Sequence, residues 1–137
     1  MNLIAQEVKT LLENHDYGYP VSVVRSFNAG IKVFPRIVVK QINDMTVSRD
    51  ANKELVSLLV FQIEIYTQDA ENAQGEVVGR VELSDDIANQ IDALIYQKYK
   101  MNRDEITDDD AYATDTTRRI LRYSCAIDQF GYTYRIA

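Results

Sequence analysis

The stretch Val56–Thr67 constrains the fold more than any other part of the sequence, because it has the pattern of one long β-strand. Its hydrophobic residues alternate and share one face: Leu59, Phe61, Ile63 and Ile65. The other face begins apolar and ends polar: Leu58, Val60, Gln62, Glu64 and Tyr66. The segment is therefore predicted to be a strand of a sheet that has one continuous apolar face.

Further strands are predicted on both sides of this segment. Val21–Phe27 is short and β-branched, and Pro35 opens a second run, Arg36–Ile42, at a position where proline removes no interior ladder bond. Arg118–Asp128 alternates along its length, and the short glycine-containing stretch 129–131 predicts a hairpin to a returning strand at Tyr132–Ile136.

Two helices are predicted from apolar residues at helical spacing. The first follows Leu3–Leu12 with Asn2 as N-cap, and it ends before a Gly- and Pro-containing turn. The second lies within Glu76–Lys100; the longer helix is preferred, and a start with Ser84 as N-cap is the alternative. The order of elements predicts an α+β fold, in which two helices pack on one face of a mainly antiparallel sheet. Residues 1–137 are expected to form a single domain.

The segment Asn43–Glu54 is too polar for a core and too long for a tight turn. Two interpretations remain open: a long loop, or the exposed end of an extended hairpin that serves as an arm. Its charged residues Arg49, Asp50 and Lys53 are candidates for contacts with another subunit.

Composition and charge exclude several classes of protein. Lys and Arg number 15 against 21 Asp and Glu, a net charge of -6, which argues against tight sequence-independent binding to nucleic acid. One Cys cannot form an internal disulfide. No apolar run is long enough to span a membrane, and the N-terminus has no pattern of a secretion signal. The cytoplasm of the cell that makes the protein is the expected first location.

The residues that could carry enzymatic chemistry are few. His15, the only imidazole, lies in the predicted turn, and Cys125 is predicted on the apolar face of a strand, where a free Cys usually acts as a small hydrophobe. The five glycines match no phosphate-binding spacing. We therefore expect no catalytic residues, no metal and no cofactor.

The acidic stretch from Met101 to Asp115 is the most conspicuous polar feature, and it is predicted to be an irregular loop. Its central carboxylates lie close together in the sequence: Asp104, Glu105, Asp108, Asp109 and Asp110. The stretch lacks the Gly and the distal Glu of a helix-loop-helix calcium site. A solvated loop and a surface that repels a passing polyanion both fit this composition. Arg118, Arg119 and Arg122 follow it, and they could pair with it inside one subunit or on a neighbour.

Three stretches of the chain resemble the tail terminator proteins, also called tail-to-head joining proteins, of bacteriophages with long non-contractile tails. The first is the N-terminal helix followed by the proline-led strand Phe34–Val39. The second is the long strand Ser57–Tyr66 followed by a helix. The third is the ending Arg118–Asp128 closed by Tyr132–Arg135. Together they span most of the chain, and the likeness lies in the order and length of elements.

The resemblance implies a structural protein of the virion, at the junction of tail and head, that has no active site. Members of that family form a hexameric ring on the head-proximal end of the tail tube, stop its polymerisation and present a surface to the head-closure or connector protein. DNA passes through the lumen without specific binding. Under this reading Arg118, Arg119, Arg122, Arg49, Asp50 and Lys53 are candidate interface residues. The acidic stretch Asp104–Asp110 is a candidate for the lumen or a ring face.

The sequence is also compatible with two other functions. A head-closure or tail tube protein of the same kind of phage would share a small α+β or β-rich design. A small metal-dependent hydrolase using the acidic stretch would bind divalent metal with a defined stoichiometry.

Overall fold

The structure is a computed structural model, which describes residues 4–26, 33–50, 53–71, 74–101, 103–128 and 133–134 of the chain. Its elements follow the predicted order of helix, strands, helix and strands. They are α1 (Ile4–Glu13), β1 (Ser22–Val24), β2 (Arg36–Asp50), β3 (Lys53–Thr67), β4 (Ala70–Glu71), β5 (Val77–Val78), α2 (Arg80–Tyr99), β6 (Glu105–Ala113), β7 (Thr116–Asp128) and β8 (Thr133–Tyr134). The predicted N-cap Asn2 lies outside the described residues.

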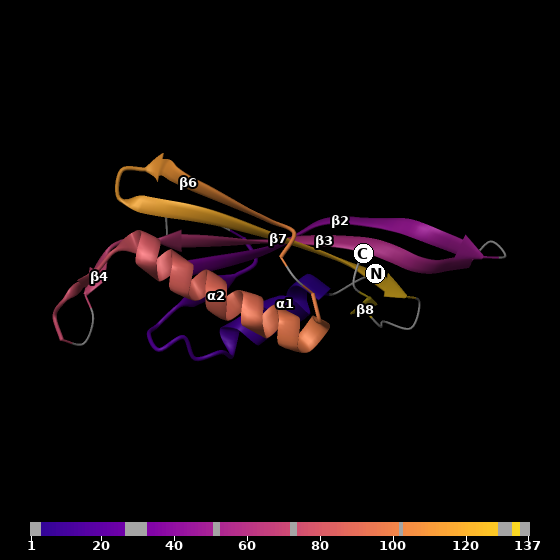
Figure 1. Ribbon diagram of the computed structural model, residues 1–137, viewed down its shortest axis with the longest axis horizontal. Coiled ribbons are helices and arrows are strands. Elements are labelled where there is room, and N and C mark those ends of the chain that lie inside the picture. Colours follow the sequence, from indigo (N-terminus) through magenta and orange to yellow (C-terminus); the bar gives the residue numbers. More distant parts are fainter. Residues whose placement is uncertain are drawn as a thin grey trace.

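A six-stranded sheet organises the molecule in the order β1-β2-β3-β7-β6, and β8 pairs with β7 off this path. Only the β1–β2 pair is parallel, and the other pairs of this sheet are antiparallel. Both helices lie on one side of the sheet, as Figure 1 shows. The α+β prediction, with two helices on one face of a mainly antiparallel sheet, is confirmed.

The hydrophobic core lies between that face and the helices. The alternation predicted for β3 is present, because Phe61, Ile63 and Ile65 are completely buried while their neighbours point to the other side. Cross-strand registers extend these positions into apolar rows: Ile37 beside Ile65, and Val39 and Leu121 on either side of Ile63. The helices contribute the facing apolar side chains, including Val8, Leu12, Ile87, Ile91 and Ile95.

The β2–β3 hairpin continues well beyond the helices (Figure 1). Among the residues whose side chains are described, the last row over the core joins Gln41, Phe61 and Tyr123, and the Phe61 and Tyr123 rings stack with centroids 5.3 Å apart. Past this row β2 and β3 stay paired as far as Asp50 and Lys53, and Arg49 pairs with Glu54. Of the two interpretations of segment 43–54, the extended hairpin is confirmed for the backbone. The side chains of Arg49, Asp50 and Lys53 lie outside the described residues.

Two local predictions were wrong. The acidic stretch is not an irregular loop, because Glu105–Ala113 forms the edge strand β6, paired with β7. Carboxylates disfavour strands locally, but the opposing arginines of β7 supply cross-strand partners of opposite charge. The second helix begins later than the preferred boundary, since Val77 and Val78 form β5 and Gly79 is the N-cap. Ser84, the alternative cap, lies buried inside the helix.

Candidate functional site

A buried carboxylate lies at the centre of the sheet face that points away from the helices. Glu64 of β3 is only 1 % exposed. Its Oε2 lies 3.1 Å from Nζ of Lys40 on β2 and 3.4 Å from Nη2 of Arg118 on β7. Lys40 lies opposite Gln62 and Arg118 lies opposite Tyr66, so both cations are diagonal neighbours of Glu64 on the same face of the sheet. Three adjacent strands therefore place one anion between two cations.

Neutral donors complete the surroundings of Glu64. The Tyr66 hydroxyl donates to Oε1 at 2.7 Å, and Gln62 Nε2 donates to Oε2 at 2.5 Å. Arg122 Nε in turn donates to Gln62 Oε1 at 2.9 Å. We call Lys40, Gln62, Glu64, Tyr66 and Arg118 the Glu64 cluster.

The ionisation of Glu64 follows from these contacts. Burial alone would raise the pKa of this carboxyl, but hydrogen bonds from Tyr66, Lys40 and Gln62 and the charge of Lys40 outweigh the burial. The pKa of Glu64 is therefore held below its ordinary value of 4.5.

This lowered pKa predicts a loss of stability in acid. Because the carboxylate is stabilised in the folded state, its contribution is complete above pH 4.5 and disappears as the pH falls through the folded-state pKa. Urea unfolding from neutral pH down to about pH 3 would measure this loss in the unmodified protein and in Glu64→Gln. The amide cannot titrate, so the stability gap between the two proteins should narrow below pH 4.5. Two curves that stay parallel would contradict the expectation.

The three arginines of β7 do not share one surface. Arg118 and Arg122 lie on the face of the Glu64 cluster, whereas the alternate residue Arg119 lies on the helix side. Arg119 is 8 % exposed, donates to Asp108 Oδ1 at 2.6 Å and pairs with Asp85 of α2. Hydrogen bonds to both carboxylates outweigh the effect of burial and raise the pKa of the Arg119 guanidinium above its ordinary value.

The pairing of arginines with the acidic strand is thus found inside one subunit. Arg118 Nη1 also lies 3.8 Å from Asp109 Oδ2. The Asp104 carboxylate accepts a hydrogen bond from the Ser124 hydroxyl, and the Asp104 backbone N–H donates to the Arg122 carbonyl at 2.8 Å. Glu105 and Asp108 remain exposed at the edge of the sheet, and the side chain of Asp110 lies outside the described residues. A role of these residues between subunits stays a prediction. Arg119 is mostly buried within its own subunit, where it pairs with Asp85 and Asp108.

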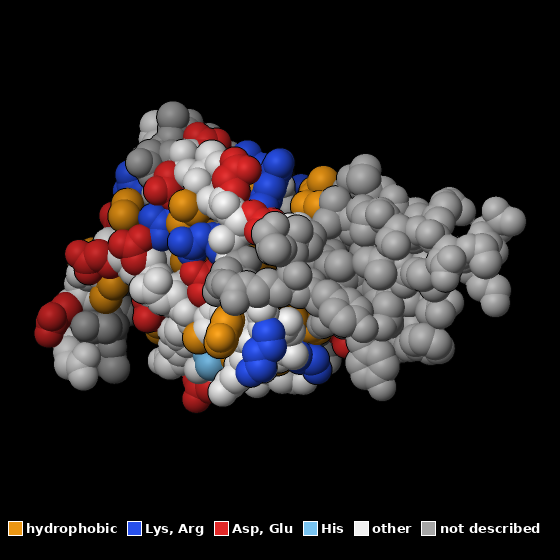
Figure 2. Space-filling model, turned by 45° about the vertical axis from the view of Figure 1, so that its right-hand side comes forward, with side chains coloured by type: hydrophobic (Ala, Val, Ile, Leu, Met, Phe, Trp, Pro, Cys, Tyr) orange, Lys and Arg blue, Asp and Glu red, His pale blue; other side chains and the backbone are white. Residues whose placement is uncertain are grey.

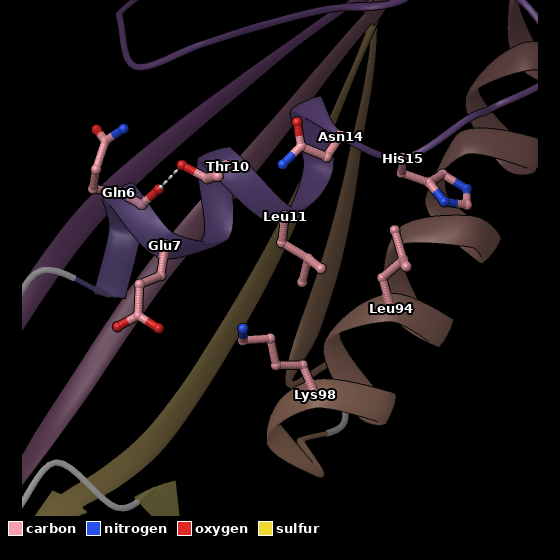
Figure 3. Close-up of a pocket in the computed structure, with 8 residues that line it drawn as sticks. All are labelled: Gln6, Glu7, Thr10, Leu11, Asn14, His15, Leu94 and Lys98. Atoms are coloured by element: carbon pink, nitrogen blue, oxygen red, sulfur yellow. Dashed lines mark hydrogen bonds between the residues drawn. The ribbon is translucent and has the colours of Figure 1, made fainter.

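His15 lines an open cavity of about 600 Å³ between α1 and α2. Figure 3 shows Leu11 and Leu94 pointing into it from the two helices, with Lys98 at one end. The His15 Nε2 lies 2.7 Å from Oε1 of Gln90, so this ring nitrogen is engaged by an amide. The Cys125 side chain lies outside the described residues.

The sequence reasoning missed two clusters that bring together distant segments. Of the Glu64 cluster, the sequence showed only that Gln62, Glu64 and Tyr66 form the polar end of one strand face. Asp92 of α2, which accepts hydrogen bonds from Tyr123 of β7 and Arg103, carried no sequence signal. Within the described residues, no group of three or more His, Cys, Asp or Glu side chains is placed to hold a metal ion. No helix there has both the length and the apolarity to cross a membrane.

Comparison with known proteins adds no family assignment, because no protein-family model and no curated protein sequence matches the chain.

Proposed function

We propose that the chain is a phage structural protein, a tail terminator that forms a ring on the head-proximal end of the tail tube. The ring stops tube polymerisation and joins the tail to the head-closure or connector protein. The protein is made in the host cytoplasm and ends in the virion. It acts by assembly and not by catalysis.

The observation that carries the proposal is the β2–β3 hairpin, which continues beyond the last core row of Gln41, Phe61 and Tyr123 (Figure 1). Beyond Val38, no strand in the described part of the chain pairs with the outer edge of β2. Proteins that stay monomeric cover or blunt long strand edges. A projecting hairpin with an open edge is therefore suited to contact a neighbouring copy or the tube.

The charge of the subunit agrees with a passage for DNA. Each chain carries a net charge of -6, so a ring of six, the number implied by the resemblance, carries about -36. The exposed acidic residues of the edge strand β6 contribute to this charge. A negative lumen repels phosphates and lets DNA slide through without binding.

The proposal predicts a closed oligomer. Light scattering behind size exclusion, over a wide range of concentration, should show a species near 94 kDa, about six times the 15.7 kDa chain. Added to purified tail tubes, the protein should occupy one end and prevent further growth. Oligomers whose mass keeps rising with concentration, without a closed species, would instead identify a tube protein. Stoichiometric binding of a divalent metal would favour the hydrolase.

A further inference from the structure

A second cavity, of about 680 Å³, lies at the end of the molecule where α2 begins. The turn Gly18–Pro20, the Phe34–Pro35 pair and the β4–β5 hairpin surround it. Apolar walls come from Tyr19, Pro20, Phe34, Pro35, Val78 and Leu83. We call this cavity the α2-start pocket.

Three carboxylates also line the α2-start pocket: Glu71, Glu82 and Asp86. Asp86 Oδ2 accepts hydrogen bonds from the Tyr19 hydroxyl at 2.7 Å and from Gln90 Nε2 at 3.0 Å, and both donors are neutral. No Lys or Arg of the described residues forms an ion pair with any of the three. The Arg36 guanidinium already lies 5.7 Å from the centre of the Phe34 ring, which leaves Tyr19 as the other aromatic wall. A pocket with an aromatic wall and carboxylates that no described Lys or Arg pairs with suits an ammonium group on an apolar stem.

The opposite end of α2 presents such groups. Lys98 and Lys100 are exposed, and their ammonium nitrogens lie 6.0 Å and 5.5 Å from the ring centres of Tyr99 and Tyr96. Within the described part of the chain, neither lysine is ion-paired with a carboxylate. Figure 2 shows Asp and Glu side chains gathered at the left end, and Lys and Arg side chains beside the histidine further along.

The two charged sets cannot meet within one subunit. Glu82 and Lys98 are both on α2, and at a rise of about 1.5 Å per residue they lie roughly 24 Å apart along its axis. The helix dipole accounts for acids at the start and bases at the end of α2. It does not account for a cavity with aromatic walls beside the acids.

We propose that the Lys98–Lys100 end of one copy docks in the α2-start pocket of the next copy. The two surfaces differ, so the contact is heterologous, and it repeats around a ring when the rotation from copy to copy closes. The inference rests on the proposed ring and names one of its subunit contacts. Because the contact is formed by charges near the surface, salt should weaken it.

Charge reversal in the full chain tests the contact. Glu71→Lys/Glu82→Lys changes the pocket, and Lys98→Glu/Lys100→Glu changes the docking end. Among the described residues, none of these four side chains is buried in the core or forms an ion pair, so both variants should fold as the unmodified protein does by circular dichroism. At low salt, each variant alone should associate at least tenfold more weakly, as measured by light scattering. An equimolar mixture of the two should regain association, because each acidic surface then meets a basic one. The mixed ring alternates, so it closes with six copies and not with an odd number.

The outcomes separate this contact from the proposed function. A closed oligomer unaffected by either reversal would overturn the contact and leave the terminator function standing. Open filaments that the reversals abolish and the mixture restores would support the contact and contradict the terminator function. A mixture that stays dissociated, or an unmodified chain that stays monomeric at the highest attainable concentration, would overturn the contact.

Discussion

Replacing Glu64 by alanine is expected to lower the free energy of unfolding by about 3 kcal/mol, the low end of the range for breaking a buried ion pair. The reason is the charge left behind, since Lys40 and Arg118 both face Glu64 across neighbouring strands. The Tyr66 hydroxyl and the Gln62 amide would lose their acceptor as well. Lys40 is 40 % exposed, so water can reach part of the cluster, which keeps the loss at that low end. Urea unfolding at neutral pH measures the difference.

Glu13→Ala is the matched control for this experiment. Glu13 pairs with Lys9 at 3.0 Å across one turn of α1, and half of its side chain is exposed. Such a pair contributes only about 0.5 kcal/mol. Equal losses in the two variants would contradict the buried character of Glu64. The double variant Lys40→Met/Glu64→Leu should recover part of the lost free energy of unfolding, because it removes the Lys40 charge together with the carboxylate that neutralises it.

The sequence predicted the fold where the residues of one element carried the signal by themselves. The alternation of Phe61, Ile63 and Ile65 needs no partner to be recognised, and burial of one face then fixes the register of β2 and β7 against it. The spacing of Ile87, Ile91 and Ile95 likewise predicted α2, although its start was placed too early.

The candidate sites depend on partners that are distant in the sequence, which explains why they were missed. The edge strand β6 was taken for a loop because its Asp residues disfavour strands, while Arg118 and Arg119, which pair with them, lie on another strand. Glu64 acquires its lowered pKa only when β2 and β7 flank β3. The α2-start pocket combines segments from residue 18 to residue 86. No local pattern contains such an arrangement.

Shortening the β2–β3 hairpin should abolish ring formation while leaving the domain folded. Met45 and Leu58 are directly paired, so an Asn-Gly turn can replace residues 46–57 without a change of register. The core rows from Ile37 to Gln41 and from Phe61 to Ile65 remain intact, and the midpoint of thermal unfolding should fall by no more than about 5 °C. If the hairpin is the contact with the neighbour or the tube, the closed oligomer should be lost and purified tubes should no longer be capped.

A control with the same turn separates hairpin length from turn chemistry. Asp50 and Lys53 are directly paired across residues 51–52, so Ala51→Asn/Asn52→Gly introduces Asn-Gly at full length. This variant should form the ring and cap tubes as the unmodified chain does. If the shortened variant also caps tubes, the hairpin is not the contact, and the observation that carries the proposed function fails. If only the shortened variant fails while its thermal unfolding stays cooperative, the loss lies in assembly and not in folding, because the core rows from Ile37 to Gln41 and from Phe61 to Ile65 contain none of the residues removed.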